Sequence, residues 1–244
     1  MELTFLGTGS AFAGDANNAA YILDRRILVD AGAPVHVLIR QSGHHIAELE
    51  AAVISHQHAD HTFGLPYVMA TRAIEHPEAP PFTIVGPPGF EDYIAGLFHL
   101  AWGTKLKEIV WNLLQPRFIE LGPAESAEVA GFQVHSETVV HVPDIPCLGY
   151  VFVRDGIRFG YSGDSGPCPG LDALVEVSDY FLIEMTGVEE EDHSHMSRAG
   201  VEAIVQLNPT KTFYLTHLNR RWATEPIPGA LYAEDLQTVE LQPV

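Results

Sequence analysis

The stretch His56-Gln57-His58-Ala59-Asp60-His61 places three imidazoles and one carboxylate within six residues. Imidazole nitrogen and carboxylate oxygen bind zinc and similar divalent ions, and a mixed set of this size can serve two neighbouring ions. A surface histidine cluster is the simpler alternative, but the specificity of the spacing disfavours it. The stretch therefore predicts a metal site.

A buried strand is predicted directly before the histidines. Residues 51–55 form a short apolar run with β-branched side chains, which is typical of a strand covered on both faces. The histidines would then lie on the loop at the carboxyl end of this strand. In α/β proteins that end of the sheet carries the ligand sites, so we expect the cluster at a functional edge.

The chain of 244 residues has 46% hydrophobic content, which is enough to bury a substantial core, and we expect one domain, residues 1–244. No stretch approaches the roughly 18 to 20 apolar residues of a membrane span, so no membrane partner is expected. The N-terminal residues are already strand-like and show no basic and apolar signal pattern. We therefore expect a cytoplasmic protein.

The two cysteines, Cys147 and Cys168, are too few for a disulfide framework and agree with a reducing compartment. Each lies near a candidate metal ligand in the sequence. Isolated cysteines are most often small buried side chains, and ligation of a soft metal is the minor alternative.

The chain is strongly acidic. Thirteen Lys plus Arg against 32 Asp plus Glu give a net charge of −19, which would repel a polyanion unless basic residues gathered on one face. The nearest basic clusters are only the pairs Arg25-Arg26 and Arg220-Arg221. The acidic run at residues 189–192 is interpreted as a solvated loop, or secondarily as a gate against large anionic substrates.

The pattern of apolar runs and turn residues predicts an α/β or α+β protein with two sheets. Strands are expected at residues 2–6, 19–23, 26–30, 51–55, 82–86, 117–121, 130–137, 148–153, 157–161, 179–184, 212–216 and 237–241, and helices at 34–42, 64–75, 88–101, 104–114, 170–176 and 197–207. Asp155-Gly156 predicts a tight hairpin. The apolar segment 97–114 is expected in the core, or alternatively at the active-site mouth or a homodimer interface.

Three further ligand-type residues follow predicted strands. These are His141, Asp164 and His217. Because strand ends of one sheet meet at a common edge, we expect these side chains near the histidine cluster. An aspartate can bridge two ions, and a hydroxide between them would be a nucleophile at neutral pH, since zinc lowers the pKa of bound water to about 7.

The motif H-x-H-x-D-H at residues 56–61 resembles the signature of the metallo-β-lactamase superfamily. Its ribonuclease Z branch is similar in further segments, which are residues 3–11, 28–32, 61–66, 149–150, 162–164 and 216–222. Together these segments extend over nearly the whole chain.

This resemblance implies a four-layer αβ/βα sandwich with a binuclear site. It implies one ion held by His56, His58 and His141, a second ion held by Asp60, His61 and His217, and Asp164 as the bridge between them. Zinc is the expected ion, and the same nitrogen and oxygen ligands would accept manganese or iron.

The resemblance also implies catalytic residues. His195 would donate a proton to the leaving oxygen, and Asp60 would orient or deprotonate the attacking water. His195 is preferred to His193 because Ser197 can cap the following helix and so fix the loop. His193 is interpreted as a solvated loop residue.

Arg221 and Trp222 follow the last expected ligand. A guanidinium there could clamp a phosphate oxygen, and an indole could stack on a base or sugar. The alternative is a surface ion pair beside a partly buried aromatic.

One feature of the ribonuclease Z pattern is missing. Enzymes of that branch that process transfer RNA commonly carry a long arm between the third histidine ligand and the bridging aspartate, but here His141 and Asp164 are 23 residues apart. Two predicted strands fill this interval. With the acidic charge, this makes transfer RNA an unexpected partner and favours small phosphodiesterases, such as those acting on cyclic phosphates.

The sequence therefore predicts a binuclear metal-dependent hydrolase, in which a metal-bridging hydroxide attacks a small cyclic or nucleotide-like phosphodiester. The alternatives are a ribonuclease Z-type RNA endonuclease and a hydrolase of a carboxylic ester, lactone or β-lactam, since a bridging hydroxide also attacks carbonyls. A non-catalytic metal-binding protein is the alternative of a different class.

Overall fold

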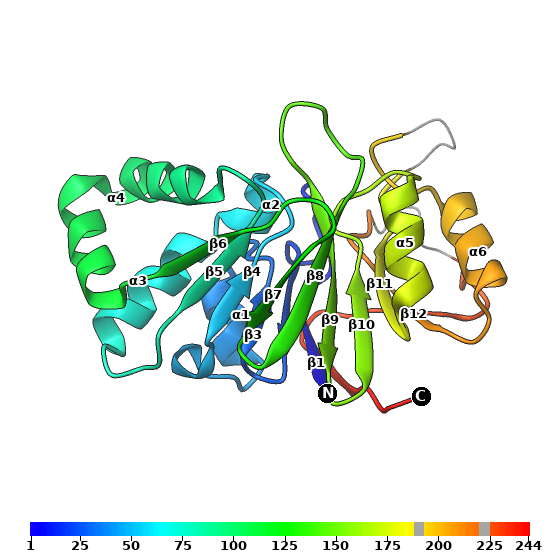
Figure 1. The fold of residues 1–244 in the computed structure, drawn as a ribbon, viewed down its shortest axis with the longest axis horizontal. Coiled ribbons are helices and arrows are strands. Elements are labelled where there is room, and N and C mark those ends of the chain that lie inside the picture. The colour runs from blue at the N-terminus through cyan, green and yellow to red at the C-terminus, as the bar shows by residue number, and fades with distance from the viewer. Residues whose placement is uncertain (188–192, 220–224) are drawn as a thin grey trace.

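Two seven-stranded sheets lie face to face at the centre of the computed structural model (Figure 1). The structure describes residues 1–187, 193–219 and 225–244. Helices cover the outer faces of both sheets, so the chain forms four layers. This confirms the expected αβ/βα sandwich.

The first sheet has the strand order β14-β1-β2-β3-β4-β5-β6. Its strands are β1 (Glu2–Gly7), β2 (Ala20–Leu23), β3 (Ile27–Val29), β4 (Ala51–Val53), β5 (Thr83–Gly86), β6 (Arg117–Glu120) and β14 (Gln237–Glu240). Pairing is antiparallel from β14 to β3 and parallel from β3 to β6. The parallel strands β3, β4 and β5 therefore end at the same edge of the sheet.

The second sheet has the order β13-β12-β11-β10-β9-β8-β7. Its strands are β7 (Glu125–Val129), β8 (Phe132–Thr138), β9 (Leu148–Arg154), β10 (Ile157–Tyr161), β11 (Tyr180–Glu184), β12 (Thr212–Thr216) and β13 (Ala230–Tyr232). Strands β9 and β10 form the predicted hairpin, with positive φ angles of 50° at Asp155 and 77° at Gly156. Such angles are those of the tight turn that this dipeptide favours.

The main core lies between the sheets. Phe5 and Tyr21 of the first sheet pack in one cluster with Phe152, Phe159 and Leu182 of the second. Strands β2 and β4 are buried along their whole length, because one face meets this core and the other meets the helices. Continuous apolar runs rather than alternating ones follow from this double covering.

Helices form the two outer layers (Figure 1). Helices α1 (Val35–Gln41), α3 (Leu65–Glu75) and α4 (Phe90–Leu114) pack on the first sheet, and α5 (Pro169–Val177) and α6 (Arg198–Leu207) pack on the second. A short 3-10 turn, η1 (Ile46–Glu48), and the single-turn α2 (Ala59–Thr62) complete the described helices. None of the helices in the described part of the chain is long and apolar enough to cross a membrane.

The apolar segment 97–114 lies within α4. The two helices expected at 88–101 and 104–114 meet at Gly103, whose φ of 73° and ψ of 175° break the helical geometry. Phe98 and Val110 are buried against the first sheet, whereas Leu100 is 84% exposed. The core interpretation therefore holds for one face of the segment.

Four described elements differ from the sequence prediction, and one of them is the 3-10 turn η1, where no helix is predicted. The sequence predicts no strand at the mostly polar residues of β7, and the structure places this strand at the exposed edge of the second sheet. Strand β13 has three residues, too few to show a period. The histidine stretch was expected on a loop, but Asp60 and His61 lie in α2, a helix of four residues and too short for a periodic pattern.

Candidate active site

The expected ligand residues come together where strands of both sheets end. His56 and His58 follow β4, Asp60 and His61 lie in α2, His141 follows β8, Asp164 follows β10, and His217 follows β12. Their ligand atoms form two groups, each with all atoms within 4.8 Å of one another. The groups are His56, His58, His141 and Asp164, and Asp60, His61, Asp164 and His217. Asp164 belongs to both.

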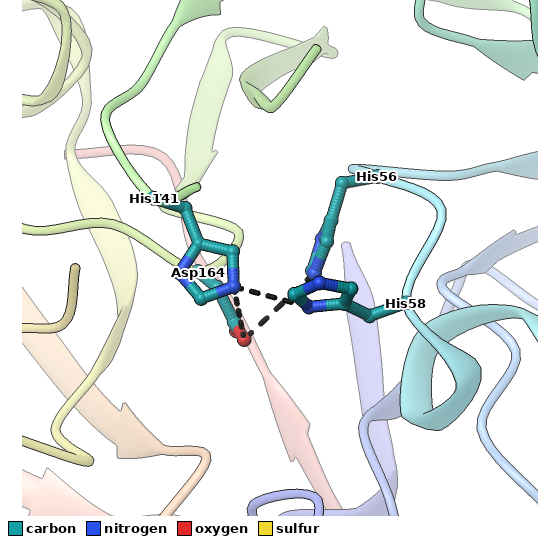
Figure 2. Close-up of side chains that lie close together, drawn as sticks. All are labelled: His56, His58, His141 and Asp164. Atoms are coloured by element: carbon teal, nitrogen blue, oxygen red, sulfur yellow. Dashed lines mark hydrogen bonds and ion pairs between the residues drawn. The ribbon is translucent and has the colours of Figure 1, made fainter. Parts of the chain in front are cut away.

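The first group is shown in Figure 2, where the four side chains point toward one another. His141 Nε2 lies 3.1 Å from His58 Nδ1 and 3.8 Å from Asp164 Oδ2. His56 Nε2 lies 3.9 Å from the same oxygen. This nitrogen is buried and has no hydrogen-bond partner among the described residues. Buried polar atoms are normally satisfied, so His56 fits the role of a metal ligand.

The second group is equally tight. His217 Nε2 lies 3.0 Å from Asp60 Oδ2 and 3.4 Å from Asp164 Oδ2. His61 Nε2 lies 3.3 Å from Asp60 Oδ2 and 3.3 Å from Asp164 Oδ1. Two imidazole nitrogens thus face two carboxylates in a buried space, which is a suitable donor set for zinc.

The backbone before Asp164 depends on a glycine. Gly163 has a φ of +58°, and a Cβ at this position would lie 2.7 Å from the carbonyl oxygen of Leu148 and 3.0 Å from the Ser55 Cβ. A side chain would therefore be strained and crowded. The close approach of β9 and the end of β4 brings Asp164 between the two ligand groups.

Asp30 holds the ligand His61 in place, and the sequence analysis did not identify it. It is fully buried after β3 and accepts hydrogen bonds from His61 Nδ1 at 2.7 Å, Ser55 Oγ at 2.8 Å and Tyr161 OH at 2.6 Å. A carboxylate behind a histidine fixes its tautomer and leaves Nε2 to face the metal. The signal that could have revealed it is an aspartate at the end of a buried apolar strand.

Other histidines are held in the same way. His141 Nδ1 donates to the carbonyl oxygen of Ser194 at 2.8 Å, and His217 Nδ1 donates to Thr186 Oγ1 at 2.6 Å. These bonds direct the Nε2 atoms of both rings into the site. Thr186 is a further supporting residue that the sequence prediction did not include.

The protonation states suit metal binding. Burial, together with the charge of His61, holds the pKa of His56 well below its ordinary value, and burial lowers the pKa of His58. Burial alone would raise the pKa of Asp60, but hydrogen bonds from His217 and His61 hold it below its usual range. Neutral imidazoles and ionised carboxylates are the forms that bind metal.

His61 and Asp164 show how strongly the site attracts positive charge. Burial disfavours the charged form of His61, but the carboxylates of Asp164 and Asp30 raise its pKa well above the ordinary value. Burial would raise the pKa of Asp164, whereas the charges of His217 and His61 hold it well below its usual range. A divalent cation could take the place of these protons.

His195 lies beside both ligand groups. Its ring centroid is 4.7 Å from that of His141 and 5.8 Å from that of His217. Its Nδ1 is 2.7 Å from Oε1 of Glu184, a carboxylate that is fully buried at the end of β11. Glu184 was missed in the sequence, although it follows the same rule as Asp164, an acidic residue at the end of a predicted strand.

The loop of His195 is fixed as expected. Ser197 Oγ accepts a hydrogen bond from the Gly200 backbone nitrogen at 3.1 Å and so caps α6. His193 is exposed, as its interpretation as a solvated loop residue required.

The family comparison agrees with this geometry. A family model described as a beta-lactamase superfamily domain matches residues 25–218. The chain belongs to the metallo-β-lactamase superfamily. The motif at residues 56–61 and the likeness to the ribonuclease Z branch were the features that predicted this membership.

Among the curated relatives of this chain, ribonuclease Z from Lactobacillus helveticus is 31% identical over 164 residues. The matched residues cover 64% of this chain and 49% of the relative. The chain thus spans about half the length of that relative. Ribonuclease Z from Metallosphaera sedula is 21% identical over 99% of both chains.

Solved structures share the metallo-β-lactamase fold. The short form of human tRNase Z has a TM-score of 0.76 and 23% identity, covering 99% of this chain and 100% of its own. A diphosphatase from the PhnP family has a TM-score of 0.73 and 18% identity over 98% and 96% of the two chains. Zinc-bound PqqB from Methylobacterium extorquens has a TM-score of 0.73 and 14% identity over 99% and 100%. At these identities the likeness shows the fold alone.

A cavity of about 510 Å³ in this metallo-β-lactamase-fold protein is lined in part by five of the ligand residues, which are His58, Asp60, His141, Asp164 and His217. Its described lining includes the loop residues Ser10, Phe12 and Asn18, together with Phe63 and His195. No lining residue in the described chain comes from the segment 97–114, so the structure does not support that segment as the site mouth. Arg221, Trp222 and the acidic run at 189–192 lie outside the described residues.

The two cysteines lie in different surroundings. Cys147 is buried, and burial raises the pKa of its thiol to about 11. Cys168 Sγ accepts a hydrogen bond from the Leu171 backbone nitrogen at 3.4 Å and caps α5. Neither belongs to a ligand group formed by the described residues.

Proposed function

We propose that the chain is a metal-dependent phosphodiesterase that acts on a small phosphodiester and that residues 1–244 form one hydrolase domain. The observation that carries the proposal is the membership of Asp164 in two adjacent ligand groups, with His195 beside them. Both sheets contribute residues to each group, which is why we treat the chain as one unit.

The proposed ligands divide between two divalent ions, with zinc as the first choice and manganese or iron as alternatives. His56, His58 and His141 would hold one ion, Asp60, His61 and His217 would hold the other, and Asp164 would belong to both ligand sets. Such ions would act as Lewis acids toward the phosphoryl group and lower the pKa of water.

Two protein groups would move protons. Asp60 is kept ionised by its hydrogen bonds and would orient the attacking water or accept its proton. His195 would give a proton to the leaving oxygen while its Nδ1 side is held by Glu184 at 2.7 Å. A carboxylate in this position orients the ring and stabilises its protonated form.

The cavity, the fold and the charge of the chain favour a small substrate. About 510 Å³ is within the range of small-molecule sites. Strands β9 and β10 fill the interval between His141 and Asp164, where the long arm of ribonuclease Z enzymes would begin. The charge of −19 disfavours a polyanionic substrate.

The proposal is tested by turnover of bis(p-nitrophenyl) phosphate after zinc or manganese is restored to the purified protein. We expect metal-dependent hydrolysis that is lost in Asp164→Asn and retained in His193→Ala, an exposed histidine near His195. A folded, metal-loaded protein without turnover of this ester would count against a phosphodiesterase.

A ribonuclease is the second candidate, because relatives that are 31% and 21% identical are named ribonuclease Z. It is tested by incubating the metal-loaded protein with a precursor transfer RNA. Specific cleavage on the 3′ side of the transfer RNA, at rates above those for small diesters, would favour the ribonuclease.

A carbonyl hydrolase is distinguished by the role of His195. High turnover of a lactone or β-lactam that is unaffected by His195→Ala would favour that chemistry. A content near two ions per chain without hydrolysis of any ester would instead indicate a non-catalytic metal protein.

A further inference from the structure

Two phenylalanines at the cavity have no part in the proposed chemistry. Phe12 is 95% exposed, and Phe63 is 50% exposed. Both line the cavity that contains the ligand groups. Exposed aromatic side chains that line a ligand cavity commonly bind the ligand, because they gain contact area that solvent does not provide.

The loop that carries Phe12 is firmly anchored. Asp235 accepts hydrogen bonds from the backbone nitrogen and hydroxyl of Thr8 at 2.9 and 2.8 Å, and from the backbone nitrogen and side-chain amide of Asn17 at 2.7 and 2.8 Å. Thr8 at the start of the loop and Asn17 near its end are therefore held by the same carboxylate.

Backbone hydrogen bonds also hold the tip of the loop, one within the loop and one to Leu218. Ala13 N donates to Ser10 O at 3.1 Å, and Ser10 N donates to Leu218 O at 3.3 Å. Phe12 lies within this turn. Its exposure therefore comes from a defined loop conformation that directs it away from the core.

The cavity lining combines two kinds of surface. The ligand groups would bind the phosphate, whereas Phe12, Phe63 and the small side chains of Ala11, Ala33 and Ala59 make the lining partly apolar. A planar group attached to the phosphate could stack on an aromatic ring there, as bases do on aromatic side chains in nucleic-acid-binding proteins.

We propose that Phe12 and Phe63 determine specificity by contacting a planar aromatic group, a nucleobase or an aryl ring, on the phosphodiester whose phosphate lies at the ligand groups. This inference rests on the proposed function for the identity of the phosphate end. It narrows the substrate from any small phosphodiester to one with an aromatic substituent.

The test measures binding, so that it does not depend on turnover. Dissociation constants of phenylphosphonate, methylphosphonate and adenosine 5′-monophosphate are measured by calorimetry on the zinc-loaded protein. We expect phenylphosphonate or the nucleotide to bind more tightly than methylphosphonate. Phe12→Ala should weaken binding of the aromatic ligand roughly 5- to 150-fold, the range for loss of one stacking contact, and leave the affinity for methylphosphonate unchanged.

Matched variants separate recognition from loop structure. Phe12→Tyr keeps the ring and should keep the affinity, and Phe63→Ala should act in the same direction as Phe12→Ala. Leu100→Ala removes another exposed apolar side chain, 84% exposed on α4 and outside the described cavity lining, and should change nothing. If the alanine variants lose affinity for the nucleotide alone, the bound group is a nucleobase. If they lose affinity for phenylphosphonate, it is an aryl group close to the phosphate.

Three results would overturn the inference. These are equal affinity for methylphosphonate and both aromatic ligands, equal weakening of all three ligands in Phe12→Ala, and no weakening in either alanine variant. Sedimentation of Phe12→Ala checks a contact between copies, and a dimer that dissociates with unchanged affinities would also overturn it. A protein that binds as expected but hydrolyses no phosphodiester would keep the aromatic contact and lose the proposed function.

Discussion

His195 Nδ1 lies 2.7 Å from Oε1 of the fully buried Glu184. The same carboxylate accepts hydrogen bonds from the backbone nitrogens of Ser165 at 3.1 Å and Thr186 at 2.8 Å. The position of the imidazole beside the ligand groups is therefore determined by a rigid acceptor. If His195 is the proton donor, changes at His195 and Glu184 should lower kcat most for substrates whose leaving oxygen needs a proton.

For His195→Ala, we expect a loss in kcat of roughly 10²- to 10⁴-fold for diesters with alkoxide leaving groups, the usual contribution of a general acid. The loss should be much smaller for p-nitrophenolate, which leaves without protonation. The measurement is kcat over a series of leaving groups, with metal content determined in parallel. Equal losses across the series would argue for a structural role.

Glu184→Gln should act through His195. We expect lower kcat with little change in KM, a shifted pH profile, and an effect that does not add to that of His195→Ala, because residues acting as one unit are not additive. The check is a double-mutant cycle on an alkyl diester. Full additivity would contradict the positioning role.

Asp30→Asn should weaken metal binding, because an uncharged amide is a weaker hydrogen-bond acceptor than the carboxylate that lies 2.7 Å from His61 Nδ1. Loss of such a supporting carboxylate typically lowers metal affinity roughly 10- to 100-fold. Competition with a zinc chelator measures the change. Glu75→Gln, which alters an exposed ion pair with Arg40, is the control and should retain wild-type affinity.

Phe159→Ala should destabilise the fold, since this fully buried ring packs between the two sheets. Deletion of a buried phenylalanine side chain costs about 3–5 kcal/mol. Urea unfolding would measure the difference, and Leu207→Ala, at a side chain 81% exposed, should change stability by less than about 0.5 kcal/mol. Similar effects of the two changes would contradict the packing of the sheets described above.

Asp179 should contribute to stability in a pH-dependent way. Its hydrogen bond with the Arg158 side chain holds the pKa of the carboxyl below the usual range. A carboxyl with a lower pKa in the folded state stabilises the fold above its unfolded pKa of about 4, and this contribution is lost as the pH falls through the folded value. Asp179→Asn should therefore be less stable than wild type at pH 7 and approach it in acid, as measured by unfolding at several pH values. A difference that is independent of pH would rule out this linkage.

Much of the fold could be predicted because its signals are local. The run at residues 51–55 and the turn Asp155-Gly156 gave correct elements, since burial and left-handed turn geometry restrict which residues are tolerated. Strand β7 was missed because its edge position permits polar side chains, and only pairing with β8 makes it a strand.

The sequence by itself determined the superfamily through the motif at residues 56–61 and the similar segments around it, and that resemblance implied the sandwich fold. It also supplied the set of proposed ligands, because each ligand type stands after an apolar strand or within one short motif. The tertiary structure places Asp164 in both groups, as the resemblance implies, and it alone decided that Asp30 and Glu184 support the histidines and that Phe12 lies at the cavity. These contacts join residues far apart in the chain. They exist because the two sheets face each other, and no local pattern encodes the distance between them.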